Sequence, residues 1–128
     1  MANPDSKRVV VTGMDAITPI GNSLKDYWAG LVAGRSGIAR ITAFDASHHA
    51  SQIAGEVKGF DPHDSLDRKE AKRMDRFTQF AVIAGQRALN HAGLVITDLN
   101  AEQVGTCIGT GVGGIKVLEE MPLFLSMR

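Results

Sequence analysis

The chain has 128 residues, of which 44% are hydrophobic, and this length suits one modest globular domain. Its 14 Lys and Arg residues equal its 14 Asp and Glu residues in number, so charge gives no reason to expect nucleic acid or an anionic membrane as a partner. The amino-terminal segment lacks the apolar core of a signal peptide, and no run approaches the roughly 18 apolar residues of a membrane span, so we expect a cytoplasmic protein.

The first predicted elements are a strand and a helix. Three consecutive β-branched residues, Val9–Val11, predict a short strand buried on both faces. A helix follows, with Ser23 as its N-cap and Gly34 as its C-cap. From residue 35 to residue 60, small and polar residues predict a loop that contains one short edge strand at 53–57.

A helical pattern extends from Leu66 to Ala92 and has two different halves. The first half contains "RKEAKR", which places a basic stripe on about two turns. The second half combines a stripe of small residues with apolar residues on its other sides, which predicts burial against more than one layer. Gly93 is expected to end this helix, and "VGTCIG" at 104–109 predicts another strand.

This order of strands and helices indicates the α/β class. Three short strands cannot cover so apolar a helix, so we expect the chain to be part of something larger or to pair with a partner. The single cysteine, Cys107, excludes an internal disulfide and fits a reducing compartment. The histidines show no zinc-binding spacing, so we expect no metal and assign surface or loop contacts to all four: His48, His49, His63 and His91.

The glycine loop, Gly109–Gly114 or "GTGVGG", fits the pattern G-x-G-x-x-G. In a dinucleotide fold this pattern follows the first strand, and an acidic residue on the second strand holds the ribose. Here the loop comes late in the chain and lacks that context. We therefore expect no nucleotide or other cofactor, and interpret the glycines as permitting close backbone packing or lining a pocket.

Four stretches, in order and with sensible spacing, carry a family resemblance: "RVVVTGMDAITPIGNSLKDYWAGLVAGRSGI", "FDASHHASQIAGEVKGFDP", "LDRKEAKRMDRFTQFAVIAGQRALNHAGL" and "VGTCIGTGVGGIKVLEE". Together they resemble the amino-terminal third of the β-ketoacyl-acyl-carrier-protein synthases, most closely the type II elongation enzymes of bacterial fatty acid synthesis. The resemblance implies a thiolase-like layered αβαβα fold, incomplete in this chain, and a homodimer. It also implies decarboxylative Claisen condensation of an acyl group with a malonyl unit, both delivered by acyl carrier protein.

The resemblance assigns no catalytic residue to this chain. The family's acyl-accepting cysteine and its two histidines follow the matching region, and Cys107 lies instead in a predicted strand, where we expect a buried, inert thiol. The chain alone is therefore expected to be inactive. One alternative is a non-catalytic module that binds acyl carrier protein, or a subunit completed by a second chain. An intact small enzyme that uses Cys107 ranks below both, because the sequence places no activating base beside it.

Two sets of residues match family positions. Lys69, Lys72 and Arg73 match the basic residues that dock the acidic acyl carrier protein, although a charged run is by default a solvated helix face. Val112 matches a residue that lines and gates the acyl tunnel, and it is flanked in the same pocket loop by Gly111 and Gly113.

Two features depart from the family pattern. Asp15 replaces a usual glycine, and a positive φ there would cost about 1 kcal/mol, so we expect a strained turn. We expect residues 1–120 to form the synthase-like portion, and we interpret 121–128 as a divergent tail of the kind that a truncated or frameshifted gene would give. Because its apolar helix lacks covering layers, we expect the isolated chain to be unstable or prone to aggregate.

Overall fold

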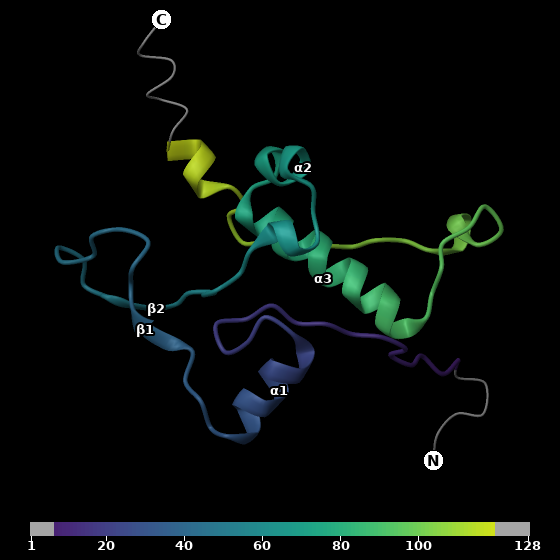
Figure 1. The fold of residues 1–128 in the computed structure, drawn as a ribbon, viewed down its shortest axis with the longest axis horizontal. Coiled ribbons are helices and arrows are strands. Elements are labelled where there is room, and N and C mark those ends of the chain that lie inside the picture. Colours follow the sequence, from purple (N-terminus) through teal and green to yellow (C-terminus); the bar gives the residue numbers. More distant parts are fainter. Residues whose placement is uncertain (1–6, 120–128) are drawn as a thin grey trace, which may run out of the picture.

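The computed structural model describes residues 7–119 (Figure 1), so the tail expected at 121–128 lies outside the described residues. The elements follow in the order α1 Leu24–Val32, β1 Ile38–Arg40, β2 Ile53–Gly55, η1 Pro62–Asp64, α2 Arg68–Arg73, α3 Arg76–Ala92 and η2 Ala101–Gln103. Residues 115–119 are also helical. In Figure 1, α3 runs through the middle of the molecule, with α2 near one end and α1 on another side.

Local signals place α1 as expected. The Ser23 hydroxyl accepts a hydrogen bond from the Asp26 amide at 3.2 Å and donates one to the Asp26 carboxylate at 2.7 Å, which fixes the first turn. The helix ends with Ala33 as its C-cap, and Gly34 follows in the left-handed region with φ of 64°. The predicted N-cap is confirmed, and the end of the helix differs by one residue.

The segment between α1 and α2 contains a two-stranded antiparallel sheet. β1 pairs with β2 in the register Ile38 to Gly55 and Arg40 to Ile53. The strand predicted at 53–57 is confirmed at its first three residues, whereas β1 was expected to be loop. Each strand is only three residues long, which leaves little periodic pattern for a sequence to display.

Two predicted strands are absent from the described residues. Val9–Val11 form no strand, and their side chains are 94%, 65% and 74% exposed. Residues 104–110 likewise form no strand and run as an irregular segment beside α3 (Figure 1). Cys107 in this segment is exposed, so its expected burial is wrong. A strand needs a neighbour that takes up its backbone N–H and C=O groups, and β1 and β2 are the only paired strands within residues 7–119.

The long helix predicted from Leu66 to Ala92 is divided in two. α2 ends where Met74 adopts extended angles, with φ of −108° and ψ of 131°, and α3 starts one residue after its N-cap, Asp75. Gly93 ends α3 with φ of 64°, as predicted. The chain therefore turns a corner directly after the basic stripe.

The small core lies where α2 meets α3. Leu66, Ala71 and Ile83 are buried together, and half-buried apolar side chains pack against them: Ile17, Phe60, Met74 and Val82. Within α3 only Ile83 is buried, so the expected burial on several sides is wrong for the described residues, which supply no second covering layer. Within residues 7–119, no helix has both the length and the apolar character needed to cross a membrane.

Candidate functional site

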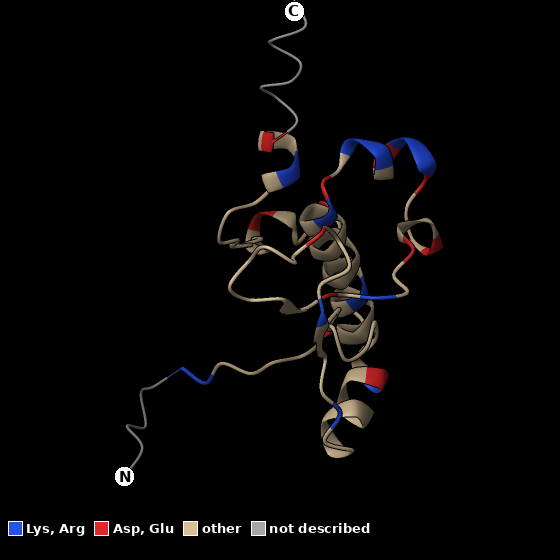
Figure 2. Cartoon of the chain, turned by 90° about the vertical axis from the view of Figure 1, so that its left-hand side faces the viewer, with Lys and Arg blue, Asp and Glu red and all other residues tan. Residues whose placement is uncertain are grey.

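The basic surface of α2 consists of Lys69, Lys72 and Arg73, all of which are exposed. Figure 2 shows α2 as a mostly blue helix near the top of the molecule. Ala71, on the other side of the same helix, is 4% exposed and belongs to the core. Burial of Ala71 therefore turns the three cations outward, and none of them forms an ion pair among residues 7–119.

Both ends of this short helix are held by side chains of the same chain. The Asp67 carboxylate accepts hydrogen bonds from the amides of Lys69 at 2.6 Å and Glu70 at 2.9 Å. At the other end, Nε2 of Gln79 donates to the Ala71 carbonyl at 2.9 Å and to the Met74 carbonyl at 3.2 Å. Because Gln79 lies on α3, these bonds fix the direction in which α2 projects from α3.

The glycine loop forms a turn in front of the helical residues 115–119. Gly113 has φ of 78°, a conformation that favours glycine, and its amide donates to the Thr110 hydroxyl at 3.2 Å. Val112 is 68% exposed, and a Cβ on Gly111 would meet nothing within 4 Å. The three predicted pocket residues therefore lie together on an open turn.

A cavity of about 300 Å³ adjoins the start of this loop. Its walls come from three parts of the chain: residues 15–17, the side chains of Phe77 and Phe80 on α3, and residues 108–110. Gly111, Val112 and Gly113 are not among its lining residues. The cavity is mostly apolar and offers contacts suited to a hydrocarbon group.

A wider groove of about 570 Å³ follows the small-residue stripe of α3. Thr12, Gly13 and Asp15 lie on one side of it and residues 104–108 on another, and Cys107 is among the latter. The sequence predicted a strand at 104–109, and residues 12–15 directly follow the strand predicted at 9–11. The groove is consequently the space left between two unpaired segments.

Asp15 lies in an anchoring contact and shows no backbone strain. Within the described residues only glycines have positive φ, so the strained turn expected at this position is wrong. The Asp15 side chain is 8% exposed, accepts a hydrogen bond from the Leu24 amide at 3.2 Å, and lies 3.8 Å from the guanidinium of Arg87. Arg87 also donates to the Asn22 carbonyl at 2.8 Å, which ties α3 to the start of α1.

The start of α3 contacts the glycine loop. The Asp75 carboxylate lies against Gly114, and a Cβ built on Gly114 would overlap it. A Cβ on Gly113 would lie 3.7 Å from Cζ of Phe77. The guanidinium of Arg76 lies 5.1 Å from the centre of the Phe80 ring and donates to the Val57 carbonyl at 3.1 Å, which steadies the same corner.

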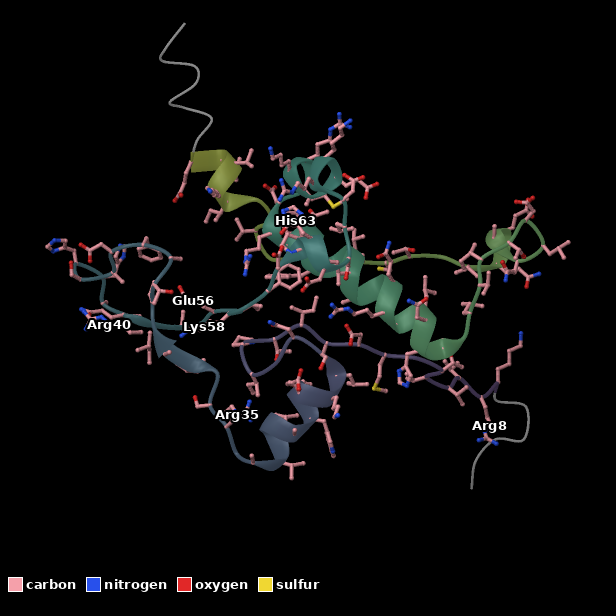
Figure 3. All side chains as sticks on the ribbon, viewed as in Figure 1. Arg8, Arg35, Arg40, Glu56, Lys58 and His63 are labelled. Atoms are coloured by element: carbon pink, nitrogen blue, oxygen red, sulfur yellow. The ribbon has the colours of Figure 1, made fainter. Side chains whose placement is uncertain are left out.

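None of the four histidines takes part in the contacts between α3 and the glycine loop described above. All four are exposed; Figure 3 labels His63, whose amide donates to the Asp61 carboxylate at 2.9 Å. Nδ1 of His91 lies 2.9 Å from the Met14 carbonyl, near the carboxyl end of α3. Within residues 7–119, no three His, Cys, Asp or Glu side chains converge as metal ligands would.

Comparisons with known proteins point to one family. The profile described as "Beta-ketoacyl synthase, N-terminal domain" matches residues 6–124. A 3-oxoacyl-[acyl-carrier-protein] synthase 2 from Synechocystis sp. is 62% identical over 125 residues, which are 98% of this chain and 30% of that protein. The protein with the same description from Staphylococcus aureus strain N315 is 46% identical over 114 residues, which are 89% of this chain and 28% of that protein.

Two solved structures resemble the chain. The ishigamide ketosynthase/chain length factor gives a TM-score of 0.71 at 34% identity, covering 91% of this chain and 30% of that one. A beta-ketoacyl synthase from Burkholderia phymatum gives a TM-score of 0.59 at 31% identity, covering 76% and 24%. The chain therefore spans about 30% or less of the length of each of these relatives.

Proposed function

The chain belongs to the β-ketoacyl synthase family, and we propose that it is the part of a fatty-acid condensing enzyme that receives acyl carrier protein and shapes the acyl pocket. The family recognised in the sequence is confirmed, as is the thiolase-like fold class, of which this chain holds the amino-terminal part. In the condensation, the bond between the malonyl α-carbon and its carboxylate breaks to release carbon dioxide, and its electron pair forms the new bond to the acyl carbonyl carbon. The thioester bond of the acyl group then breaks, and its sulfur leaves as a thiolate.

The basic surface of α2 is the observation that carries this proposal. Its three cations are exposed, unpaired among residues 7–119, and held in a fixed direction by Asp67 and Gln79. An acidic partner gains most from such a surface, because its charge steers the encounter and the fixed helix orients the complex. The relatives' names specify an acyl-carrier-protein substrate, which supports that partner.

We assign the acyl-pocket role to Val112, Gly111 and Gly113. The apolar cavity beside Gly109 and Thr110 supports this assignment, because an acyl chain that reached the loop would find aromatic walls next to it. We also propose a homodimer for the completed enzyme. Its support is the apolar surface that residues 7–119 leave uncovered, such as Trp28 at 65% exposure.

The second candidate is a carrier-binding module, or a subunit completed by another chain. It is favoured by the structure of α2, since both ends of that helix are capped by residues of this chain. We assign no catalytic residue to the chain, and expect no condensation from it alone. If condensation occurs when a second chain is added and survives the substitution Cys107→Ser, the subunit explanation is supported over local cysteine chemistry.

Binding of a bacterial acyl carrier protein tests the proposal directly. The triple variant Lys69→Glu, Lys72→Glu, Arg73→Glu should weaken binding by about tenfold or more. Raising the salt concentration should also weaken binding of the native chain, but by less than the triple substitution does. The matched control makes the same change in charge at three exposed arginines away from α2, namely Arg8, Arg35 and Arg40 (Figure 3). Equal losses in both triples, or no binding by the native chain, would contradict docking on α2.

A further inference from the structure

Two aspartates begin the two helices of the α2–α3 corner, and their side chains behave differently. Asp67 and Asp75 have almost the same backbone angles, with φ, ψ of −69°, 160° and −63°, 158°. Asp67 accepts two amide hydrogen bonds from the first turn of α2, whereas the side chain of Asp75 accepts none from α3. Since the backbone of Asp75 is that of an ordinary N-cap, its carboxylate is directed elsewhere for another reason.

That carboxylate lies against the glycine loop. A Cβ on Gly114 would lie 2.9 Å from Cγ of Asp75 and would overlap its oxygen, so only glycine fits while the carboxylate holds this position. Gly114 itself has no positive φ, and its backbone would accept alanine. The requirement for glycine at this position therefore comes from Asp75.

We propose that Asp75 is a positioning residue: its carboxylate holds the glycine loop in place and transmits carrier docking on α2 to the acyl pocket. The inference about docking rests on the proposed function. Asp75 suits this task because Arg73, in the basic surface of α2, lies two residues before it. Gln79 bonds to Met74, the residue directly before Asp75, so a displacement of α2 reaches Asp75 through a constrained backbone.

A different rotamer of Asp75 would give its carboxylate other partners. If it turned away from Gly114, it could accept the amides of Phe77 and Thr78, which lie in the first turn of α3 and lack intrahelical acceptors. The two positions exclude each other, because one carboxylate cannot both cap α3 and hold the loop. A bound carrier would shift the balance between them by its preference for one position of α2.

Hydrogen exchange read by mass spectrometry tests the positioning role in the 128-residue chain. The amides to follow are those of Gly113, Ile115 and Leu118, whose hydrogen-bond acceptors lie within residues 110–114. Asp75→Ala and Gly114→Ala should each speed exchange in the loop, and the double variant should be no faster than either, because both remove one contact. Asp75→Asn keeps the side-chain shape and should restore slow exchange.

Two controls match these variants. Gly113→Ala introduces strain at φ of 78°, so its effect should add to that of Asp75→Ala. Asp67→Ala should speed exchange in α2 and leave the loop unchanged. Unchanged loop exchange in Asp75→Ala, or full additivity of Asp75→Ala with Gly114→Ala, would overturn the positioning role.

Addition of bacterial acyl carrier protein then tests the transmission. In the native chain, exchange should change in both α2 and the glycine loop, whereas in Asp75→Ala the change in α2 should remain and that in the loop should be lost. A loop response that persists in Asp75→Ala overturns transmission through Asp75. If the carrier leaves α2 unchanged in the native chain, the proposed docking fails, and the carrier-free comparison still decides whether Asp75 positions the loop.

Discussion

The α2–α3 corner and the segments at 9–11 and 104–110 differ in where their contacts come from. At the corner, α2 buries Ala71 beside Ile83 and is tied to α3 by Gln79, a residue only eight positions away from Ala71 in sequence. The two other segments carry β-forming residues but have no strand partners within residues 7–119. Structure that depends on sequence neighbours is therefore present in this chain, whereas a strand at 9–11 or at 104–110 would need partner strands that the described residues do not supply.

The largest expected effect would break the corner. Ile83 is fully buried, so Ile83→Ala should lower the free energy of unfolding by about 2–5 kcal/mol. The substitution should also loosen the packing of α2 on the start of α3. Hydrogen exchange of α2 amides measures this loss. As a control, Val112→Ala on the exposed loop should change stability by less than about 0.5 kcal/mol. A small effect at Ile83 would mean that the corner is not held by its core.

The next effect concerns the anchored part of the amino-terminal segment. Asp15→Ala removes the acceptor of the Leu24 amide and leaves Arg87 without its carboxylate, and should cost about 1–3 kcal/mol. Urea unfolding followed by fluorescence of Trp28, the sole tryptophan, measures the cost. When Asp15→Ala is added to a chain that already carries Arg87→Ala, the further loss of unfolding free energy should be smaller than in the native chain. Equal losses in both backgrounds would refute coupling between the two side chains.

A smaller effect separates the two helix starts. Asp67→Ala removes two cap hydrogen bonds and should destabilise α2 by about 1 kcal/mol. Asp75→Ala removes no cap bond and should leave the stability of α3 nearly unchanged. Exchange of amides within each helix provides the measurement. Comparable losses in α3 and α2 would show that Asp75 acts as an ordinary cap.

The smallest effect is a dependence on pH in the β1–β2 region. Hydrogen bonds from the side chain and amide of Thr42, and from the Ala43 amide, lower the pKa of Glu56 from 4.5, with a minor contribution from Lys58 (Figure 3). A lowered pKa means that the ionised group stabilises the fold above pH 4.5, and that this contribution is lost as pH falls through the lower folded value. As pH falls, amide exchange at Thr42 and Ala43, corrected for intrinsic rates, should therefore accelerate more steeply in the native chain than in the Glu56→Gln variant.

Sequence reasoning succeeded where the signal was local. The cap at Ser23 and the stop at Gly93 each depend on residues within one turn. The division between α2 and α3 was missed because the hydrophobic periodicity continues through it, although Asp75 offered an N-cap signal. Strands at 9–11 and 104–109 were predicted from β-forming residues, but a strand also needs a partner that its own composition does not specify.

The candidate site was predictable to a similar degree. The pattern "RKEAKR" predicted a helix with an outward basic stripe, and the structure places Lys69, Lys72 and Arg73 on such a surface; their docking role stays a prediction, as does the pocket role of Val112. The contact of Asp15 with Arg87 and the position of Asp75 against Gly114 join residues far apart in sequence. A single sequence carries no local signal for such pairs.

The bonds from Gln79 to the end of α2 have a consequence for the order of folding. The bond to Ala71 spans eight residues and the bond to Met74 spans five, whereas the bond from Arg87 to Asn22 spans 65. Closing a short loop costs less chain entropy, so local contacts form before distant ones are gained. During refolding, the basic surface of α2 should therefore form before the amino-terminal segment packs against α3.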